Sequence, residues 1–152
     1  MKAAYINPFI NAVSRLFKTM MAFPIEVGPP GLNRRAQPQH DVCGVIDVSG
    51  TVKGRVVVSM PENLAAALAS ILIGDTIEAL DEDCIDAVGE IANMIAGNAK
   101  TDFPEVGSAI SVPWVVIGRE GVSYPPATPV INIPCETDKG PLQIDVALKT
   151  DV

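Results

Sequence analysis

The sequence is poor in the residues that many catalytic and metal sites need. It contains one histidine, His40, and three widely spaced cysteines, Cys43, Cys84 and Cys135. The usual zinc ligand sets combine several Cys and His residues, so we expect no metal site. A single histidine in a Pro/Gln stretch also makes a Ser/His/Asp or Cys/His mechanism improbable. An odd number of distant cysteines favours reduced, buried thiols and a cytoplasmic location over a disulfide framework.

Long apolar runs and positive charge are also scarce. The most apolar run, residues 64–74, is shorter than the roughly 20 residues of a membrane-spanning helix. Polar residues interrupt the N-terminal segment, so we expect no signal peptide. Acidic residues outnumber basic ones by 18 to 11, which disfavours nonspecific binding to nucleic acids or anionic membranes. The 152 residues are 48% hydrophobic and only 19% charged, which predicts one folded domain over residues 1–152.

The N-terminal third of the chain predicts a helix, a loop and a hairpin. Apolar residues at spacings of three and four predict a helix over residues 8–23, with Asn7 as its N-cap and Pro24 after its end. Residues 28–38 are rich in Pro and Gly and predict a polar loop. Residues 42–48 and 53–59 predict two strands joined by a turn.

The rest of the chain predicts two helices followed by strands. Ser59 and Glu62 are spaced as in a capping box, which predicts a helix over 62–73 that ends at Gly74. A second helix is predicted over 82–101, and strands over 108–112, 114–119, 128–134 and 143–149. The last strand alternates in polarity, which predicts a wetter face carrying Gln143 and Asp145.

This order of elements predicts an α+β fold, an antiparallel-rich sheet covered by helices. A weak internal repeat also shows, because Phe23–Pro24 and Phe103–Pro104 each close a predicted helix. Trp114 follows Pro113 in a predicted strand and is expected in the core. The acidic run 81–83 could bind a cation, but its place at a helix start favours interaction with the helix dipole.

The helix over 82–101 has two distinct faces. One stripe is apolar and predicts the buried side: Ile85, Val88, Ala92, Ile95 and Ala99. Asp86, Glu90, Asn93 and Gly97 lie on the opposite side, and Glu90 and Asn93 are one turn apart. A glycine inside a helix costs about 0.5–1 kcal/mol relative to alanine, and close approach of another backbone is the usual reason. Spacing alone favours an ordinary solvated helix face, so Glu90 and Asn93 by themselves do not establish a catalytic site.

Residues 89–100 resemble the signature helix of the CheC/CheX/FliY family of chemotaxis phosphatases. The family motif, Glu-x-x-Asn followed by a Gly-Asn pair, is matched by Glu90, Asn93, Gly97 and Asn98. Residues 5–13 and 110–118 are similar to the opening helix and the central strand of CheX. The resemblance extends over most of the chain and implies a CheC-like α/β sandwich.

Members of this family hydrolyse the phosphoaspartate of the receiver domain of the response regulator CheY. The resemblance implies that Asn93 orients the attacking water and that Glu90 pairs with a lysine of the receiver. Asp86, Met94 and Gly97 are expected to contact this partner. The Mg²⁺ of the reaction is expected on the receiver, with no cofactor bound by this chain.

Two further expectations follow from the resemblance. Because the helix over 8–23 lacks a Glu-x-x-Asn motif, we expect one site, as in CheX. CheX proteins also look like homodimers that pair their edge strands, and an exposed edge needs a partner or a cover. The alternative function is a noncatalytic module that binds a receiver or another signalling partner.

Overall fold

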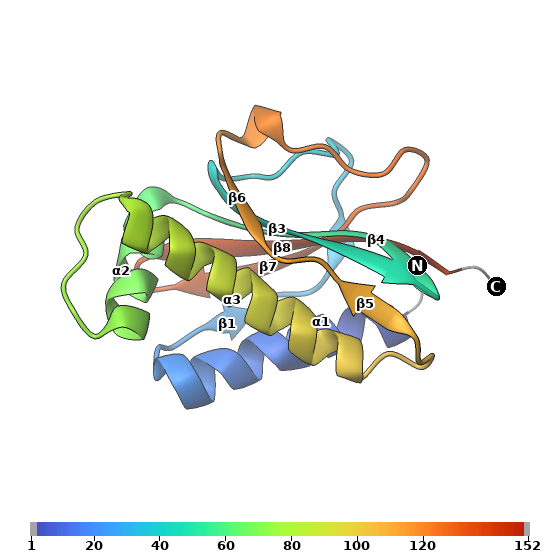
Figure 1. Cartoon of the computed structure of the whole chain (residues 1–152), viewed down its shortest axis with the longest axis horizontal. Coiled ribbons are helices and arrows are strands. Elements are labelled where there is room, and N and C mark those ends of the chain that lie inside the picture. Colours follow the sequence, from blue (N-terminus) through green and yellow to red (C-terminus); the bar gives the residue numbers. More distant parts are fainter. Residues whose placement is uncertain (1–2, 151–152) are drawn as a thin grey trace.

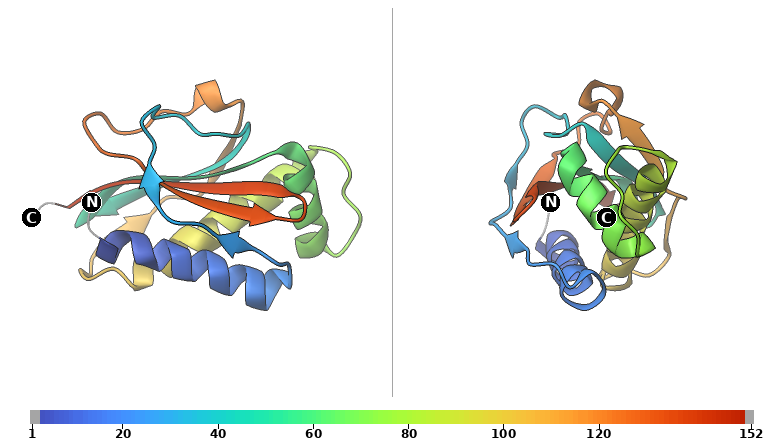
Figure 2. Two further views of the ribbon diagram at one scale, coloured as in Figure 1. Left: turned by 180° about the vertical axis from the view of Figure 1, so that it is seen from behind. Right: turned by 90° about the vertical axis from the view of Figure 1, so that its left-hand side faces the viewer.

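In the computed structural model, which describes residues 3–150, one eight-stranded sheet carries the helices on one face and long loops on the other (Figures 1 and 2). Every strand pairing in this range is antiparallel. The sheet order is β1-β7-β8-β4-β3-β5, with β2 also on β7 and β6 also on β3. The strands are β1 Glu26–Val27, β2 Gly31–Leu32, β3 Val42–Gly50, β4 Val52–Met60, β5 Ser108–Ile110, β6 Trp114–Ile117, β7 Ile131–Thr137 and β8 Gly140–Thr150. The predicted α+β fold is confirmed.

The helices α2 (Glu62–Ile73) and α3 (Glu82–Thr101) begin and end as predicted. The Gly74 end of α2 has the left-handed backbone that glycine favours, with φ of 78°. The predicted capping box is wrong, because Ser59 belongs to β4 and Pro61 is the N-cap of α2. The ladder between β3 and β4 fixes Ser59 opposite Cys43 and so holds it in the sheet.

The first helix differs from its prediction at both ends. Helix α1 spans Ala3–Leu16, so it contains Pro8 and Asn7 is not its cap. Proline removes one helical hydrogen bond, but starting earlier lets Tyr5 and Ile6 be buried. A π-helical turn, Phe17–Met21, follows and ends at Ala22, which has φ of 47°. Phe23–Pro24 and Phe103–Pro104 both follow helix ends, as the weak repeat predicts.

Part of the segment predicted as a loop over 28–38 forms strand β2, and β1 lies just before that segment. The short strands β1 and β2 both pair with β7, which makes them the edge beside it. Strand β6 ends at Ile117 because a short 3-10 helix, Arg119–Gly121, follows. Strand β7 starts later than predicted and runs to Thr137.

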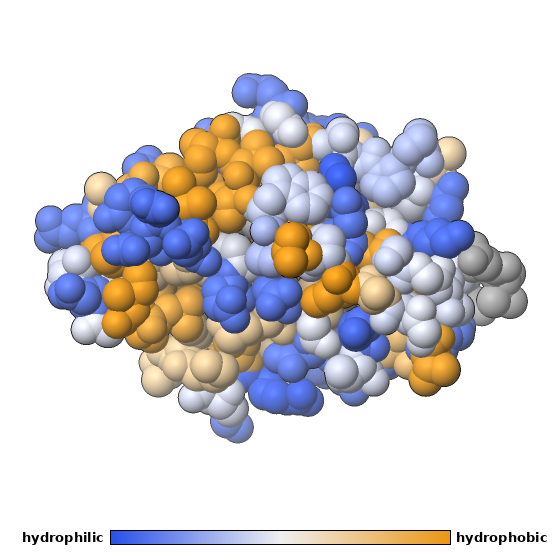
Figure 3. Space-filling model, viewed as in Figure 1, coloured by the Kyte–Doolittle hydropathy of each residue, from blue (hydrophilic) through white to orange (hydrophobic). Residues whose placement is uncertain are grey.

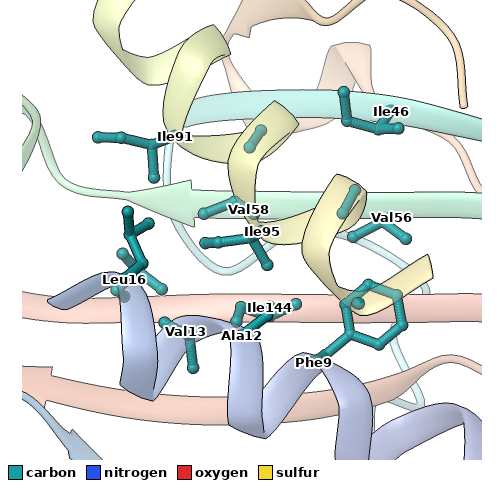
Figure 4. Packing of buried hydrophobic residues seen from close by; sticks show 14 of the residues in the cluster. Phe9, Ala12, Val13, Leu16, Ile46, Val56, Val58, Ile91, Ile95 and Ile144 are labelled. Carbon is teal, nitrogen blue, oxygen red and sulfur yellow. The ribbon is translucent and has the colours of Figure 1, made fainter. Parts of the chain in front are cut away.

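The main core lies between the helices and the sheet. Phe9, Val13 and Leu16 of α1 meet Ile91 and Ile95 of α3 over the apolar side of the central strands (Figure 4). The three cysteines are buried and free, as predicted. No helix within residues 3–150 is long and apolar enough to cross a membrane. The cytoplasmic location stays a prediction.

The other face of the sheet corrects two predictions. Gln143 and Asp145 are only 6% and 1% exposed, so the predicted wetter face of β8 is covered. Asp145 accepts hydrogen bonds from Tyr124 Oη at 2.6 Å, Asn132 Nδ2 at 3.0 Å and Asn33 Nδ2 at 3.1 Å. Loops that carry Asn33 and Tyr124 therefore close over this face.

Trp114 is the second correction, because it is 37% exposed and not a core residue. The Arg55 guanidinium lies 5.1 Å from the centre of its ring. Arg55 also donates to Asp47 from Nε at 2.8 Å. A cation stacked on an indole in this way stabilises the side chain at a surface.

Candidate functional site

Helix α3 is fixed at its start by its own cap. Asp81 Oδ1 accepts a hydrogen bond from Cys84 N at 2.9 Å, and Glu82 and Asp83 lie in the first turn. The acidic run thus serves the helix start, as its position favours. Within residues 3–150, no group of three Asp, Glu, His or Cys side chains is placed to hold a metal ion.

The inner side of α3 packs directly on the sheet. Four residues of the predicted stripe are buried, while Ile85 is only half-buried. Burial also extends to Cys84, Ala87, Gly89, Ile91 and Ala96. At Gly44 of β3, a Cβ atom would come within 2.8 Å of Ala92 Cβ and 3.2 Å of Val88 O. Gly44 thus allows α3 to lie against β3 without a gap.

The outer side of α3 carries the predicted site residues together. Asp86 and Glu90 are exposed, and Asn93 and Gly97 are half-buried. Their spacings of four, three and four place them on one stripe of the helix. Neither the Glu90 nor the Asn93 side chain makes a hydrogen bond or ion pair with any residue in the range 3–150. Both side chains are therefore available to a partner.

Within residues 3–150, the close approach of another backbone that a mid-helix glycine suggests does not occur at Gly97, and its expected contact with a partner stays a prediction. The nearest atom to a Cβ at Gly97 would be Ile110 Cδ1 at 3.7 Å, which is an ordinary contact, and no other backbone approaches it. The close approach occurs at Gly44 instead. Because Gly97 has no side chain, no group projects from the helix surface one turn beyond Asn93.

Met94, the third residue expected to touch a partner, lies at the margin of the stripe. It is half-buried and packs against the main core cluster. Part of its side chain therefore fills the core, and only its remainder is open to a partner.

A strand segment that the sequence did not connect with the site runs along the same side of α3. A Cβ at Gly89 would lie 3.6 Å from Pro113 Cβ and 3.5 Å from Val115 Cγ2. With the contact between Gly97 and Ile110, the segment 110–115 follows α3 past Glu90 and Asn93 (Figure 1). Only tertiary pairing brings it there. In the sequence, only Gly89 and Gly97 of α3 indicate that another segment lies close to this side of the helix.

This fold and motif define a family of phosphatases. Residues 42–136, more than half of the chain, match the family model described as "Chemotaxis phosphatase CheX". The chain therefore belongs to the chemotaxis phosphatase CheX family, which confirms the resemblance.

The similar proteins agree with this assignment. A curated relative, the CheY-P phosphatase CheX of Thermotoga maritima, is 26% identical over 79% of each chain. The chemotaxis protein CheX of Desulfovibrio desulfuricans has a TM-score of 0.84 at 27% identity, over 97% of this chain and 99% of that one. The CheX–CheY–BeF3–Mg²⁺ complex from Borrelia burgdorferi matches with a TM-score of 0.81 at 24% identity, over 95% and 97%. The predicted CheC-like sandwich is thereby confirmed.

Proposed function

We propose that this chain hydrolyses the aspartyl phosphate of a CheY-like receiver domain. One observation carries the proposal: the Glu90 and Asn93 side chains lie one turn apart on an outward stripe of α3, and neither has a hydrogen-bond or ion-pair partner in residues 3–150. The opposite side of the same helix is buried against β3, so the pair is held in a fixed place. The names of the relatives, a CheY-P phosphatase among them, support this substrate class.

Asn93 is proposed to orient the attacking water. Its carboxamide both accepts and donates hydrogen bonds and carries no charge that would repel a phosphoryl group. The water oxygen forms a bond to phosphorus while the bond from phosphorus to the aspartyl oxygen breaks, which releases inorganic phosphate and restores the carboxylate. Reactions of this type depend mainly on positioning and electrostatics. One well-placed amide is therefore enough for a large effect.

Glu90 is proposed to dock the receiver by pairing with one of its lysines. Its carboxylate is exposed one turn before Asn93, and Asp86 adds a second exposed carboxylate one turn earlier. A charge-assisted contact of this kind contributes about 1.5–3 kcal/mol. By the family resemblance, the Mg²⁺ belongs to the receiver, and this chain supplies no cofactor.

The homodimer remains part of the proposal. Strand β6 pairs only with β3 among the described residues, so its other edge is open. Open edges are usually covered or paired. Sedimentation at tens of micromolar is expected to give about twice 16.0 kDa, and a monomer would contradict it.

The decisive experiment follows phosphate loss from phosphorylated receivers of the same cell. Asn93→Ala should lower turnover by about 10²-fold and leave receiver binding nearly intact. Asn11→Ala, an exposed asparagine on α1, is the matched control and should hydrolyse at the wild-type rate. Wild-type activity in Asn93→Ala would refute the mechanism. A wild-type protein that binds the receiver without hydrolysis would be a noncatalytic interaction module.

A further inference from the structure

An exposed apolar side chain stands beside the Glu90–Asn93 pair. Val112 is 83% exposed, although it lies in the connection between β5 and β6 that follows α3. Figure 3 shows hydrophobic surface over this connection and over β6, next to the hydrophilic surface of α3. Single exposed hydrophobic residues are common, so the position of Val112 decides what it means.

The position of Val112 follows from its neighbours. Ile110 would contact a Cβ at Gly97, and Pro113 would contact one at Gly89. These two glycines are about 12 Å apart along the helix at 1.5 Å per residue, and Asn93 is midway between them. Val112 lies within the segment that joins the two contacts. It is therefore alongside Glu90 and Asn93 on the open side of the helix.

The connection that presents Val112 is fixed to the sheet. Ser111 N donates to Asp47 O at 2.8 Å, and Asp47 N donates to Ser111 Oγ at 2.9 Å. Strand β5 pairs with one end of β3, and β6 pairs with its other end. Val112 is thus held in place before any partner arrives, which lowers the entropy cost of binding.

We propose that the segment Ile110–Pro113, with Val112 as its anchor, is the apolar half of the docking surface for the phosphorylated receiver. This inference rests on the proposed function. A specific interface needs about 800 Å² from each partner, and one stripe of α3 supplies mainly polar side chains. Interfaces combine an apolar centre with a polar rim. Val112 supplies that centre next to the carboxylate and amide of the site.

The receiver is the occupant that fits this place. Any protein seated on Val112 also covers Asn93, because the two lie on the same open side of the molecule. A second copy of this chain bound there would block the reacting group, whereas a receiver must cover both to place its phosphoaspartate at Asn93. The side chain at residue 112 then helps to determine which receivers are bound.

The test compares two exposed valines. Val112→Asp and Val112→Ala are measured against Val106→Asp, since Val106 is 92% exposed but lies beyond the end of α3. Binding is measured with a receiver held in its active form by beryllofluoride and Mg²⁺, and initial rates are measured over a range of phosphoreceiver concentrations. Val112→Ala should raise Kd and KM about fivefold and Val112→Asp at least about tenfold, with kcat and the melting temperature unchanged. Val106→Asp should match wild type.

Several results would overturn the inference. The first is an unchanged Kd for the receiver in Val112→Asp. The second is an equal loss of receiver affinity in Val112→Asp and Val106→Asp. The third is a dimer that dissociates in Val112→Asp while its Kd for the receiver is unchanged. The inference and the proposed function fail separately. Weaker binding by Val112→Asp in a protein without hydrolysis refutes the phosphatase alone, and normal binding by Val112→Asp in an active protein refutes the docking surface alone.

Discussion

Replacement of Gly97 by alanine separates stability from function at the site. The added Cβ would meet only Ile110 Cδ1, at 3.7 Å, so the methyl group fits without strain. Alanine is favoured over glycine inside a helix by about 0.5–1 kcal/mol. For a domain of this size, 1 kcal/mol shifts the melting temperature by about 2–4 °C. Gly97→Ala is therefore expected to melt about 1–4 °C above wild type.

The same methyl group should impair hydrolysis. Gly97 is on the stripe of Glu90 and Asn93, one turn beyond Asn93, where the receiver is proposed to press against the helix. A methyl group there holds the two surfaces apart, and a displacement of about 1 Å can cost about 10²-fold in rate. We expect kcat/KM to fall by about 10- to 100-fold in a protein that is more stable than wild type.

The assays are thermal unfolding and phosphate release from the phosphoreceiver, with Gly31→Ala as control. A Cβ at Gly31 would meet nothing within 4 Å, and Gly31 belongs to β2, away from α3. A lower melting temperature for Gly97→Ala would show that the helix surface is closer packed than the structure has it. A stabilised variant with wild-type hydrolysis would show that the receiver does not contact Gly97.

Three further outcomes are expected. Gly44→Ala should destabilise the protein by about 1–3 kcal/mol in denaturant unfolding, because its Cβ would overlap Ala92. Asp145→Ala should cost about 1–3 kcal/mol in the same assay, because it leaves the donors of its buried network without an acceptor, while receiver hydrolysis continues. The hydrogen bond to Glu105 and burial raise the pKa of the Tyr5 phenol to about 12. The protonated phenol therefore stabilises the fold below about pH 10, and this stabilisation is lost as the pH rises through about 12. Ultraviolet titration of phenolate formation should show this, and Tyr5→Phe should remove that part of the alkaline loss.

The helices could be predicted where local signals agree. In α3, the Asp81 cap, the apolar stripe and the length of the pattern all favour the same boundaries, and the structure has them. In α1, the rule that proline prefers the first turn competed with burial of Tyr5 and Ile6, and burial prevailed. Ser59 failed as a cap because pairing between β3 and β4 continues past it.

The outer face of the sheet could not be predicted from alternation. A polar residue in a strand has the same pattern whether water or a loop covers it. Asp145 is buried because Asn33 and Tyr124, more than twenty residues away in sequence, bring their loops over β8. Trp114 is the opposite case. Its large apolar side chain predicts a core position, but it lies partly exposed on this face, with Arg55 over its ring.

The candidate site likewise contains residues that the sequence could predict and residues that it could not. Glu90 and Asn93 could be found from the sequence because a helix brings residues three and four apart together. The segment Ile110–Pro113 beside them could not be found, because it lies along α3 only through the pairing of β5 and β6 with β3. The small residue that sets the height of α3 above the sheet is likewise Gly44, on the strand and not on the helix. A motif on one helix can therefore specify the proposed catalytic pair, while the proposed docking surface depends on how β5 and β6 pair with β3.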